Sequence, residues 1–225
     1  MKTIVNLFGA QSIAILFFTL SFVSLNGQTK SVNPKSDYLM CSGTNSTTDI
    51  SGTFYDSGGE TGNYSNGENC TFLIHPGCAF SITLSFSSFQ MENYCDYFKV
   101  YDGIDNTGEL LLNTSGYTIP YPVIANSGAM FITFTSDGSV VASGWEAVWT
   151  SEVPTTPPIA DFSISTTTPL FNSEVQFTDL TTNYPNGWDW DFGDGHSSNL
   201  QNPVHAFQQA GLHTITLISD NCFST

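Results

Sequence analysis

Residues 80–86 read Phe80-Ser-Ile-Thr-Leu-Ser-Phe86, in which apolar and small polar side chains strictly alternate. This period of two is typical of a strand that buries one face. Residues 97–101 alternate in the same way, and residues 130–134 are rich in β-branched and aromatic side chains. Turn dipeptides such as Asp102-Gly103 separate these segments, and no useful window shows an apolar stripe of period 3.6. We therefore predict an all-β sandwich over residues 41–150.

A second group of strands is expected nearer the end of the chain. In Trp188-Asp-Trp-Asp-Phe192 the aromatic side chains should face one way and the two aspartates the other, before a tight turn at 193–195. The Pro/Thr-rich stretch 151–158 is typical of a stiff linker between modules. We therefore expect a second sandwich over residues 159–225, which stops soon after its last strong strand and so is expected to be incomplete. Its strands are predicted at 159–165, 173–178, 186–192 and 211–219.

The N-terminus has the pattern of an export signal. Residues 1–27 begin with Lys2, continue through a largely apolar stretch and end near Gly27. An uncleaved membrane anchor is the alternative, but polar residues interrupt the apolar stretch. We expect cleavage, a polar linker over 28–40 and a secreted or cell-surface location.

Charge and cysteine content limit the possible functions. The chain has four basic residues against 20 acidic residues, for a formal charge of −16, which argues against binding driven by phosphate neutralisation on nucleic acids or anionic membranes. Five cysteines in an exported chain are expected to form disulfides, although the odd number leaves at least one free or paired outside this chain.

Ordered motifs carry a resemblance over about 110 residues. The runs Gly52-Thr-Phe-Tyr-Asp-Ser-Gly-Gly, Gly62-Asn-Tyr-Ser-Asn-Gly-Glu-Asn-Cys and Asp96-Tyr-Phe-Lys-Val-Tyr-Asp-Gly, followed by Gly144-Trp, resemble a CUB domain of the bacterial kind, a jelly-roll-like sandwich. The run Trp190-Asp-Phe-Gly-Asp-Gly with Asn202-Pro-Val-His-Ala-Phe resembles a PKD domain, an immunoglobulin-like module. Neither family is catalytic in itself, so the resemblance implies binding or spacer modules.

The CUB resemblance also implies a calcium site. Calcium-binding members have a glutamate and two aspartates at the positions of Glu92, Asp96 and Asp137, with a tyrosine that corresponds to Tyr64 and orients the acids. Ser139 is expected to add a backbone oxygen. Hard cations need such oxygen ligands, and the chain has no arginine to neutralise the acids otherwise. The alternative is that these acids are solvated loop residues or turn caps.

This sequence departs from the family pattern around its cysteines. The interval from Glu92 to Asp96 is shorter than in animal members, and residues 108–116 lack the cysteine that usually pairs with the Cys95 position. The resemblance implies a Cys41–Cys70 disulfide and leaves Cys78, Cys95 and Cys222 unassigned.

No catalytic motif stands out in the chain. The sequence has no His-Glu-x-x-His helix, no Gly-x-Ser-x-Gly elbow and no phosphate-binding glycine loop. The histidines and the group Asp189, Asp191 and Asp194 are interpreted as strand, turn or surface residues. Tyrosines that are not buried could instead form a sugar-stacking or protein-contact surface, with candidates at Tyr55, Tyr94, Tyr97, Tyr101, Tyr117 and Tyr121.

We therefore expect a non-catalytic secreted or cell-surface binding or adhesion protein. Its CUB-like domain would engage a protein or glycan through a calcium-organised loop surface, and its PKD-like domain would act as a spacer. One alternative is that both domains are accessory modules of an exported peptidase or other hydrolase whose catalytic domain lies beyond Thr225. In a third hypothesis both sandwiches are inert stalks.

Overall fold

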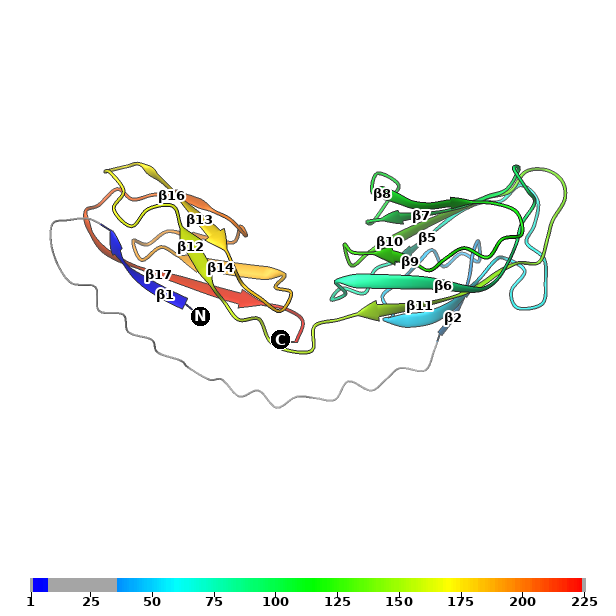
Figure 1. Ribbon diagram of the computed structural model, residues 1–225, viewed down its shortest axis with the longest axis horizontal. Coiled ribbons are helices and arrows are strands. Elements are labelled where there is room, and N and C mark those ends of the chain that lie inside the picture. Colours follow the sequence, from blue (N-terminus) through cyan, green and yellow to red (C-terminus); the bar gives the residue numbers. More distant parts are fainter. Residues whose placement is uncertain (1, 8–35, 224–225) are drawn as a thin grey trace. The chain divides into compact units, whose positions relative to one another are not determined.

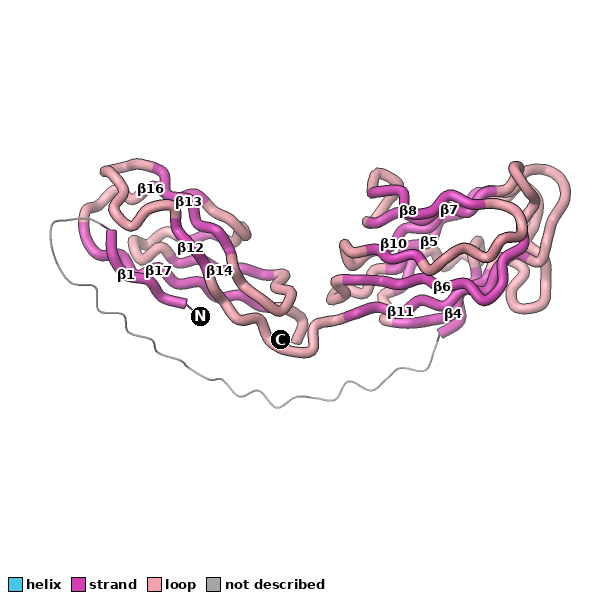
Figure 2. Tube along the Cα trace, in the orientation of Figure 1, coloured by secondary structure: helices cyan, strands magenta, loops and turns pink. Residues whose placement is uncertain are grey.

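The computed structural model describes residues 2–7 and 36–223, and the structure in these ranges consists of strands and loops without a helix (Figure 2). The chain divides into two compact units, one of which combines the N-terminal residues with the residues from Pro154 onward. We call residues 36–153 the first sandwich, and residues 2–7 with 154–223 the second sandwich. The predicted all-β class is confirmed.

The first sandwich contains two five-stranded sheets, which form its two layers (Figure 1). One sheet has the order β3-β5-β10-β7-β8, and the other has the order β2-β4-β11-β6-β9. Strands β6, β7 and β10 lie where the alternating and aromatic stretches predicted them. The bounds are β2 (Ser36–Leu39), β3 (Ser46–Thr47), β4 (Ser51–Tyr55), β5 (Asn69–Ile74), β6 (Ser81–Gln90), β7 (Tyr97–Asp102), β8 (Glu109–Thr114), β9 (Val123–Ala125), β10 (Met130–Thr135) and β11 (Gly144–Glu152).

The core of the first sandwich is strongly aromatic. Trp145 and Trp149 of β11 are buried, and the Trp145 ring meets Phe98 and Phe134 edge-on at centroid distances of 4.7 and 4.9 Å. The alternation of β6 puts Ile82 and Leu84 into the same core. These contacts hold β7 and β10 against β11. They thereby fix the ends of the loop before β7 and of the loop after β10.

The second sandwich is smaller and also has two sheets. One sheet has the order β1-β17-β14-β15 and the other has the order β12-β13-β16. Trp190 and Phe192 lie in the core while Asp189 and Asp191 are exposed, as the alternation of residues 188–192 predicted. The bounds are β1 (Lys2–Leu7), β12 (Phe162–Ile164), β13 (Glu174–Asp179), β14 (Gly187–Asp191), β15 (Ser197–Ser198), β16 (Val204–Ala206) and β17 (Gly211–Asp220).

The N-terminal segments differ in part from the sequence expectations. The expected linker 28–40 is wrong at its end, because Ser36–Leu39 forms β2 parallel to β4 and Met40 is fully buried. The Tyr38 ring supplies the physical reason, since it packs on Phe72 and Trp149. Residues 2–7 form β1, antiparallel to β17, and the rest of the predicted export signal lies outside the described residues. Within the described ranges, no helix has the length and apolar character needed to cross a bilayer.

Candidate cation site

The loops after β6 and β10 bring three carboxylates to one end of the first sandwich. β7 and β10 are antiparallel neighbours, and the pair Thr135 and Tyr97 ends their ladder. Asp96 precedes this pair on one strand and Asp137 follows it on the other. The backbone N–H of Asp137 donates to Oδ1 of Asp96 at 2.9 Å. Strand pairing therefore places two of the predicted acids side by side.

Tyr64 connects the third acid to this pair. Its side chain is buried, and its ring packs edge-on against Phe134 with centroids 5.3 Å apart. The Tyr64 hydroxyl donates to Oδ2 of Asp96 and accepts the backbone N–H of Glu92 at 2.9 Å. One phenol oxygen thus orients the carboxylate of Asp96 and fixes the start of the Glu92–Asp96 turn.

Glu92 has one carboxylate oxygen that the protein does not satisfy. Its Oε2 is shielded from solvent and has no hydrogen-bond partner. Desolvation, followed by repulsion from Asp137 and Asp96, raises the pKa of Glu92 above its ordinary value. Among the described residues no ion pair involves Glu92, Asp96 or Asp137. These carboxylates repel one another, and one of their oxygens is shielded and has no partner. A hard cation bound among them would remove the repulsion and give that oxygen a partner.

Cys95 lies in the same turn, and sequence reasoning left it unassigned. It is a free, exposed thiol, and its sulfur lies within 4.8 Å of carboxylate oxygens of both Glu92 and Asp137. Desolvation and then the neighbouring carboxylates raise the pKa of this thiol. Cys95 is therefore held as the neutral thiol, a poor ligand for a hard cation.

Ser139 lies beside Asp137 and contacts its carboxylate. Its backbone N–H donates to Oδ1 of Asp137 at 2.9 Å, so the contact orients this exposed carboxylate. The predicted role of a Ser139 backbone oxygen as a ligand stays a prediction.

The disulfide that the resemblance implied is present. Cys41 and Cys70 are bonded, with their Cα atoms 5.4 Å apart. The bond ties the segment after β2 to the start of β5, and both residues pack against the hydrophobic core.

Exposed tyrosines lie in the turn that carries Glu92 and in the loop that is hydrogen-bonded to this turn. Tyr94, in the same turn, is 78% exposed, and its backbone N–H donates to Oγ of Ser115. This hydrogen bond ties the turn to the loop that carries Tyr117 and Tyr121, which are 65% and 93% exposed. The other candidates, Tyr55, Tyr97 and Tyr101, are only partly exposed.

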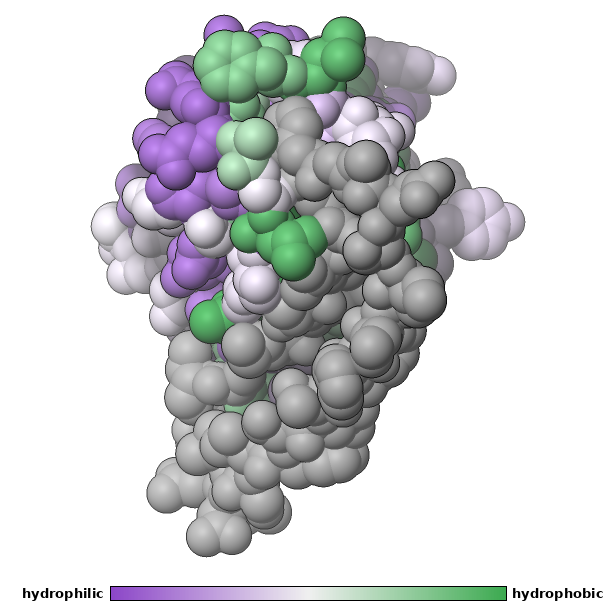
Figure 3. Space-filling model, turned by 90° about the vertical axis from the view of Figure 1, so that its left-hand side faces the viewer, coloured by the Kyte–Doolittle hydropathy of each residue, from purple (hydrophilic) through white to green (hydrophobic). Residues whose placement is uncertain are grey.

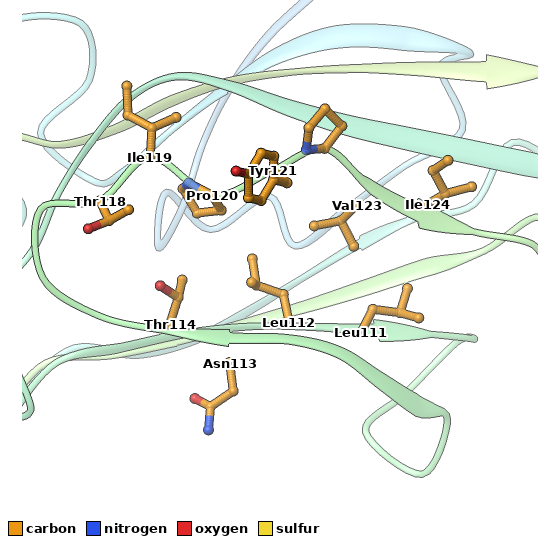
Figure 4. Close-up of a pocket in the computed structure, with 11 residues that line it drawn as sticks. Leu111, Leu112, Asn113, Thr114, Thr118, Ile119, Pro120, Tyr121, Val123 and Ile124 are labelled. Atoms are coloured by element: carbon orange, nitrogen blue, oxygen red, sulfur yellow. The ribbon is translucent and has the colours of Figure 1, made fainter.

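A shallow pocket of about 430 Å³ lies farther along that loop (Figure 4). Leu111, Leu112 and Thr114 of β8 line one side, and the segment 118–124 lines the other. The Asn113 side chain points to the opposite side of the strand (Figure 4). The lining is mostly apolar and includes no acidic, basic or histidine side chain.

Sequence reasoning missed one constellation in the second sandwich. Asp194 and His196, from the turn after β14, meet His205 of β16, although each residue was interpreted as structural. The motif Asp-x-His in the turn was visible in the sequence. The third residue, His205, lies nine positions after His196 and belongs to the other sheet.

Fold and geometry together define a chain of two β-sandwich modules, the first of which has a loop-borne carboxylate cluster. The family model described as CUB domain matches residues 41–149, and the model described as PKD domain matches residues 154–223. The chain therefore carries a CUB domain followed by a PKD domain, which are binding or accessory modules.

Relatives match over the CUB region. An astacin-like metalloendopeptidase of Gallus gallus is 39% identical over 94 residues, which cover 40% of this chain and 23% of that protein. Cubilin of Rattus norvegicus is 36% identical over 93 residues, which cover 40% of this chain and 3% of cubilin. The chain thus spans a small part of these relatives. Among solved structures, the MASP-1 CUB2 domain bound to Ca2+ matches 49% of this chain and 99% of its own, with 27% identity and a TM-score of 0.42.

Proposed function

We propose that the CUB domain binds calcium through Glu92, Asp96 and Asp137 and presents the organised loops to an extracellular partner. The observation that carries this proposal is the shielded, unpartnered oxygen of Glu92 beside two further carboxylates. Tyr64 supports the same assignment, because it holds Asp96 and the Glu92 backbone in place before any cation binds.

Each residue of the cluster has a distinct task in this proposal. Bound calcium would supply the positive charge that offsets the repulsion among the three acids. Asp96, which is buried and hydrogen-bonded from two sides, is the fixed ligand. Asp137 is exposed and Glu92 is half-buried, so these two can turn a free carboxylate oxygen toward solvent.

The partner that fits this surface is a protein with an exposed lysine or arginine. A carboxylate that is oriented by the protein forms stronger charge-assisted hydrogen bonds with such a cation than a mobile carboxylate does. Tyr94, in the turn of the acids, and Tyr117, on the loop tied to that turn, offer rigid aromatic surface for the remainder of the contact. Exposed tyrosines also stack on sugars, so a glycan is the alternative ligand of the same face.

The PKD domain acts as a spacer in this proposal, and the chain works outside the cell. A disulfide in the CUB domain suits an oxidising compartment.

Binding to extracellular matrix proteins tests the proposal. We expect binding of the full chain in millimolar calcium, its loss with a chelator, and a weakening of tenfold or more in Asp137→Ala. Where the bound cation is a lysine, acetylation of the partner's lysines should also abolish binding, because it removes their charge. Glu109→Gln, which removes another exposed acid of the same domain, is the matched control and should bind normally. Equal binding of Asp137→Ala and the unmodified chain would refute the proposal.

The metalloendopeptidase relative favours a second candidate, in which these domains are accessory modules of a larger exported hydrolase. That relative shares 39% identity with this chain over the CUB region. Sequencing the gene downstream of the codon for Thr225 tests this candidate, since it requires a catalytic domain in the same reading frame.

A further inference from the structure

The β14–β15 turn and β16 gather two imidazoles around one carboxylate in the PKD domain. His205 Nε2 lies 2.8 Å from Asp194 Oδ2, and His196 Nδ1 lies 3.2 Å from Asp194 Oδ1. Ligand atoms of all three side chains lie within 4.8 Å of one another. From this geometry we propose that Asp194, His196 and His205 form a binding site for a divalent transition-metal ion such as Zn2+.

The donor atoms suit such an ion in type and spacing. Two imidazole nitrogens with a carboxylate oxygen are a common zinc ligand set, whereas calcium prefers oxygen alone. Tetrahedral zinc with bonds of about 2.0–2.1 Å holds its ligand atoms roughly 3.3 Å apart. The nitrogen–oxygen spacings of 2.8 and 3.2 Å, which involve different oxygens of Asp194, are close to that value.

Two of the three ligands are held in position by the fold. The His205 ring is stacked on Phe192 with centroids 4.3 Å apart and planes 6° from parallel, and it meets Phe207 edge-on. The Asp194 side chain is only 9% exposed, and one of its oxygens also accepts the backbone N–H of His196 at 3.1 Å. The side chain of His196 is 65% exposed, so the surrounding protein restrains this third ligand least. The site is therefore largely preorganised.

The electrostatic environment favours a cation. Residues 154–223 contain seven acidic residues and no lysine or arginine. The Asp194 carboxylate lies within hydrogen-bond distance of both imidazole rings and also accepts the backbone N–H of His196. When the metal binds, the ring nitrogen of each imidazole that faces Asp194 must lose its proton, so that its lone pair can bind the ion. The displaced proton moves to the other ring nitrogen or to solvent.

A metal at this place would join the two sheets of the PKD domain. Asp194 and His196 belong to the turn between β14 and β15, whereas His205 belongs to β16 of the opposite sheet.

On the face seen in Figure 3, small groups of apolar side chains stand among hydrophilic ones, and we assign that face no docking role. The proposed ion would stabilise a spacer and is independent of the calcium proposal for the CUB domain.

Calorimetric titration of the full chain with Zn2+ tests the proposal. The chain carries Cys95→Ser and the solution contains millimolar calcium, so that neither the thiol nor the carboxylates of the CUB domain compete for zinc. We expect one equivalent of zinc to bind, with an affinity on the order of tenfold or more lower in His196→Ala. His196 is exposed, so this variant should fold normally. His75→Ala, which removes an exposed histidine of the CUB domain, is the matched control and should bind like the parent.

Two spectroscopic readouts accompany the titration. Bound Co2+ should give the visible bands of a tetrahedral site, and added Zn2+ should displace it. Zinc should also raise the unfolding midpoint reported by the NMR signal of the Trp190 indole without moving that of Trp149 in the CUB domain. Undetectable zinc binding, or equal affinity in His196→Ala and His75→Ala, would overturn the proposal.

Discussion

Tyr64 is the residue on which the geometry of the carboxylates depends most. Its single oxygen donates to Asp96 and accepts from the Glu92 backbone, and its ring is anchored on Phe134. Removing that oxygen leaves a buried carboxylate with one partner fewer, while the ring keeps its packing. Replacing only this hydroxyl therefore tests the hydrogen bonds of the site while the aromatic packing of the ring is kept.

We expect Tyr64→Phe to weaken calcium binding by about tenfold, because outer partners of metal ligands typically contribute 10–100-fold in affinity. The unpaired oxygen of Asp96 should cost about 1–3 kcal/mol of stability. Tyr38→Phe is the matched control, since it removes hydrogen bonds to Asp49 and Thr47 on another part of the domain. Calorimetry of both variants checks the difference, and equal affinities would contradict the role assigned to Tyr64.

Asp56 is a buried carboxyl group of the CUB domain, and its pKa depends on its surroundings. It is fully buried and accepts backbone N–H groups from Gly58 and Trp145. Desolvation dominates over these hydrogen bonds and raises the pKa of Asp56 from 3.8 to about 6. The folded state therefore binds a proton between about pH 4 and 6 that the unfolded chain has already released.

The stability that Asp56 contributes is present below about pH 4 and is lost as the pH rises through about 6. The loss should amount to about 2–3 kcal/mol, at about 1.4 kcal/mol per pKa unit. In Asp56→Asn the loss of stability between about pH 4 and 6 should disappear. The substitution itself changes stability by the same amount at every pH, so it does not affect this comparison. Urea unfolding at several pH values, followed by the NMR signal of the Trp149 indole, checks it. A variant with the same pH slope as the parent would contradict the raised pKa.

At the scale of strands, β4 and β11 pack closely because a glycine of β4, which has no side chain, lies opposite a tryptophan of β11. Gly52 pairs with Trp149, and a Cβ built on Gly52 would lie 2.1 Å from the Trp149 ring. Trp149 is fully buried and has no room to move away. The glycine at this position is required by the close approach of the indole.

We expect Gly52→Ala to destabilise the CUB domain by about 2–3 kcal/mol, the usual cost of overpacking a core. Gly77→Ala is the control, because a Cβ on Gly77 meets no atom within 4 Å. Thermal unfolding of both variants measures the effect. A Gly52→Ala protein as stable as the Gly77→Ala protein would show that β4 and β11 are less closely packed than described.

The Cys41–Cys70 disulfide should stabilise the same domain by restricting the unfolded chain. It spans 29 positions of sequence, for which loop entropy gives about 3–4 kcal/mol. The double variant Cys41→Ser/Cys70→Ser should lose about this amount in urea unfolding under non-reducing conditions. A loss below about 1 kcal/mol would mean that native contacts alone hold β5 in place.

How much could be predicted from sequence also depends on the element. The alternating stretch 80–86 was predicted as a strand, and so was the outward orientation of Asp189 and Asp191. β2 was not predicted, because its four residues show no pattern and its burial depends on Phe72 and Trp149, which are distant in sequence. The acids beside Tyr64 were predicted through family motifs. The cluster of Asp194, His196 and His205 was not, because two sheets must pack before its members meet.

At the scale of the whole molecule, the two domains differ in the cation they are proposed to hold. The CUB domain offers carboxylates in loops, and the PKD domain offers imidazoles beside one aspartate. With a net charge of −16 and only four basic residues, the chain has few internal partners for its acids. A cation bound to each domain would relieve part of this repulsion locally, and a basic partner would relieve more.

Thermal unfolding of the full chain in millimolar calcium, in millimolar magnesium and in a chelator is the most direct test of the calcium site. We predict that calcium, but not magnesium, raises the unfolding midpoint of the CUB domain, because a ligand that binds only the folded state stabilises it. The increase should vanish in Asp96→Ala and Asp137→Ala and persist in Glu109→Gln. An unfolding midpoint that is the same in calcium and in chelator would contradict the site and leave Glu92, Asp96 and Asp137 as loop residues.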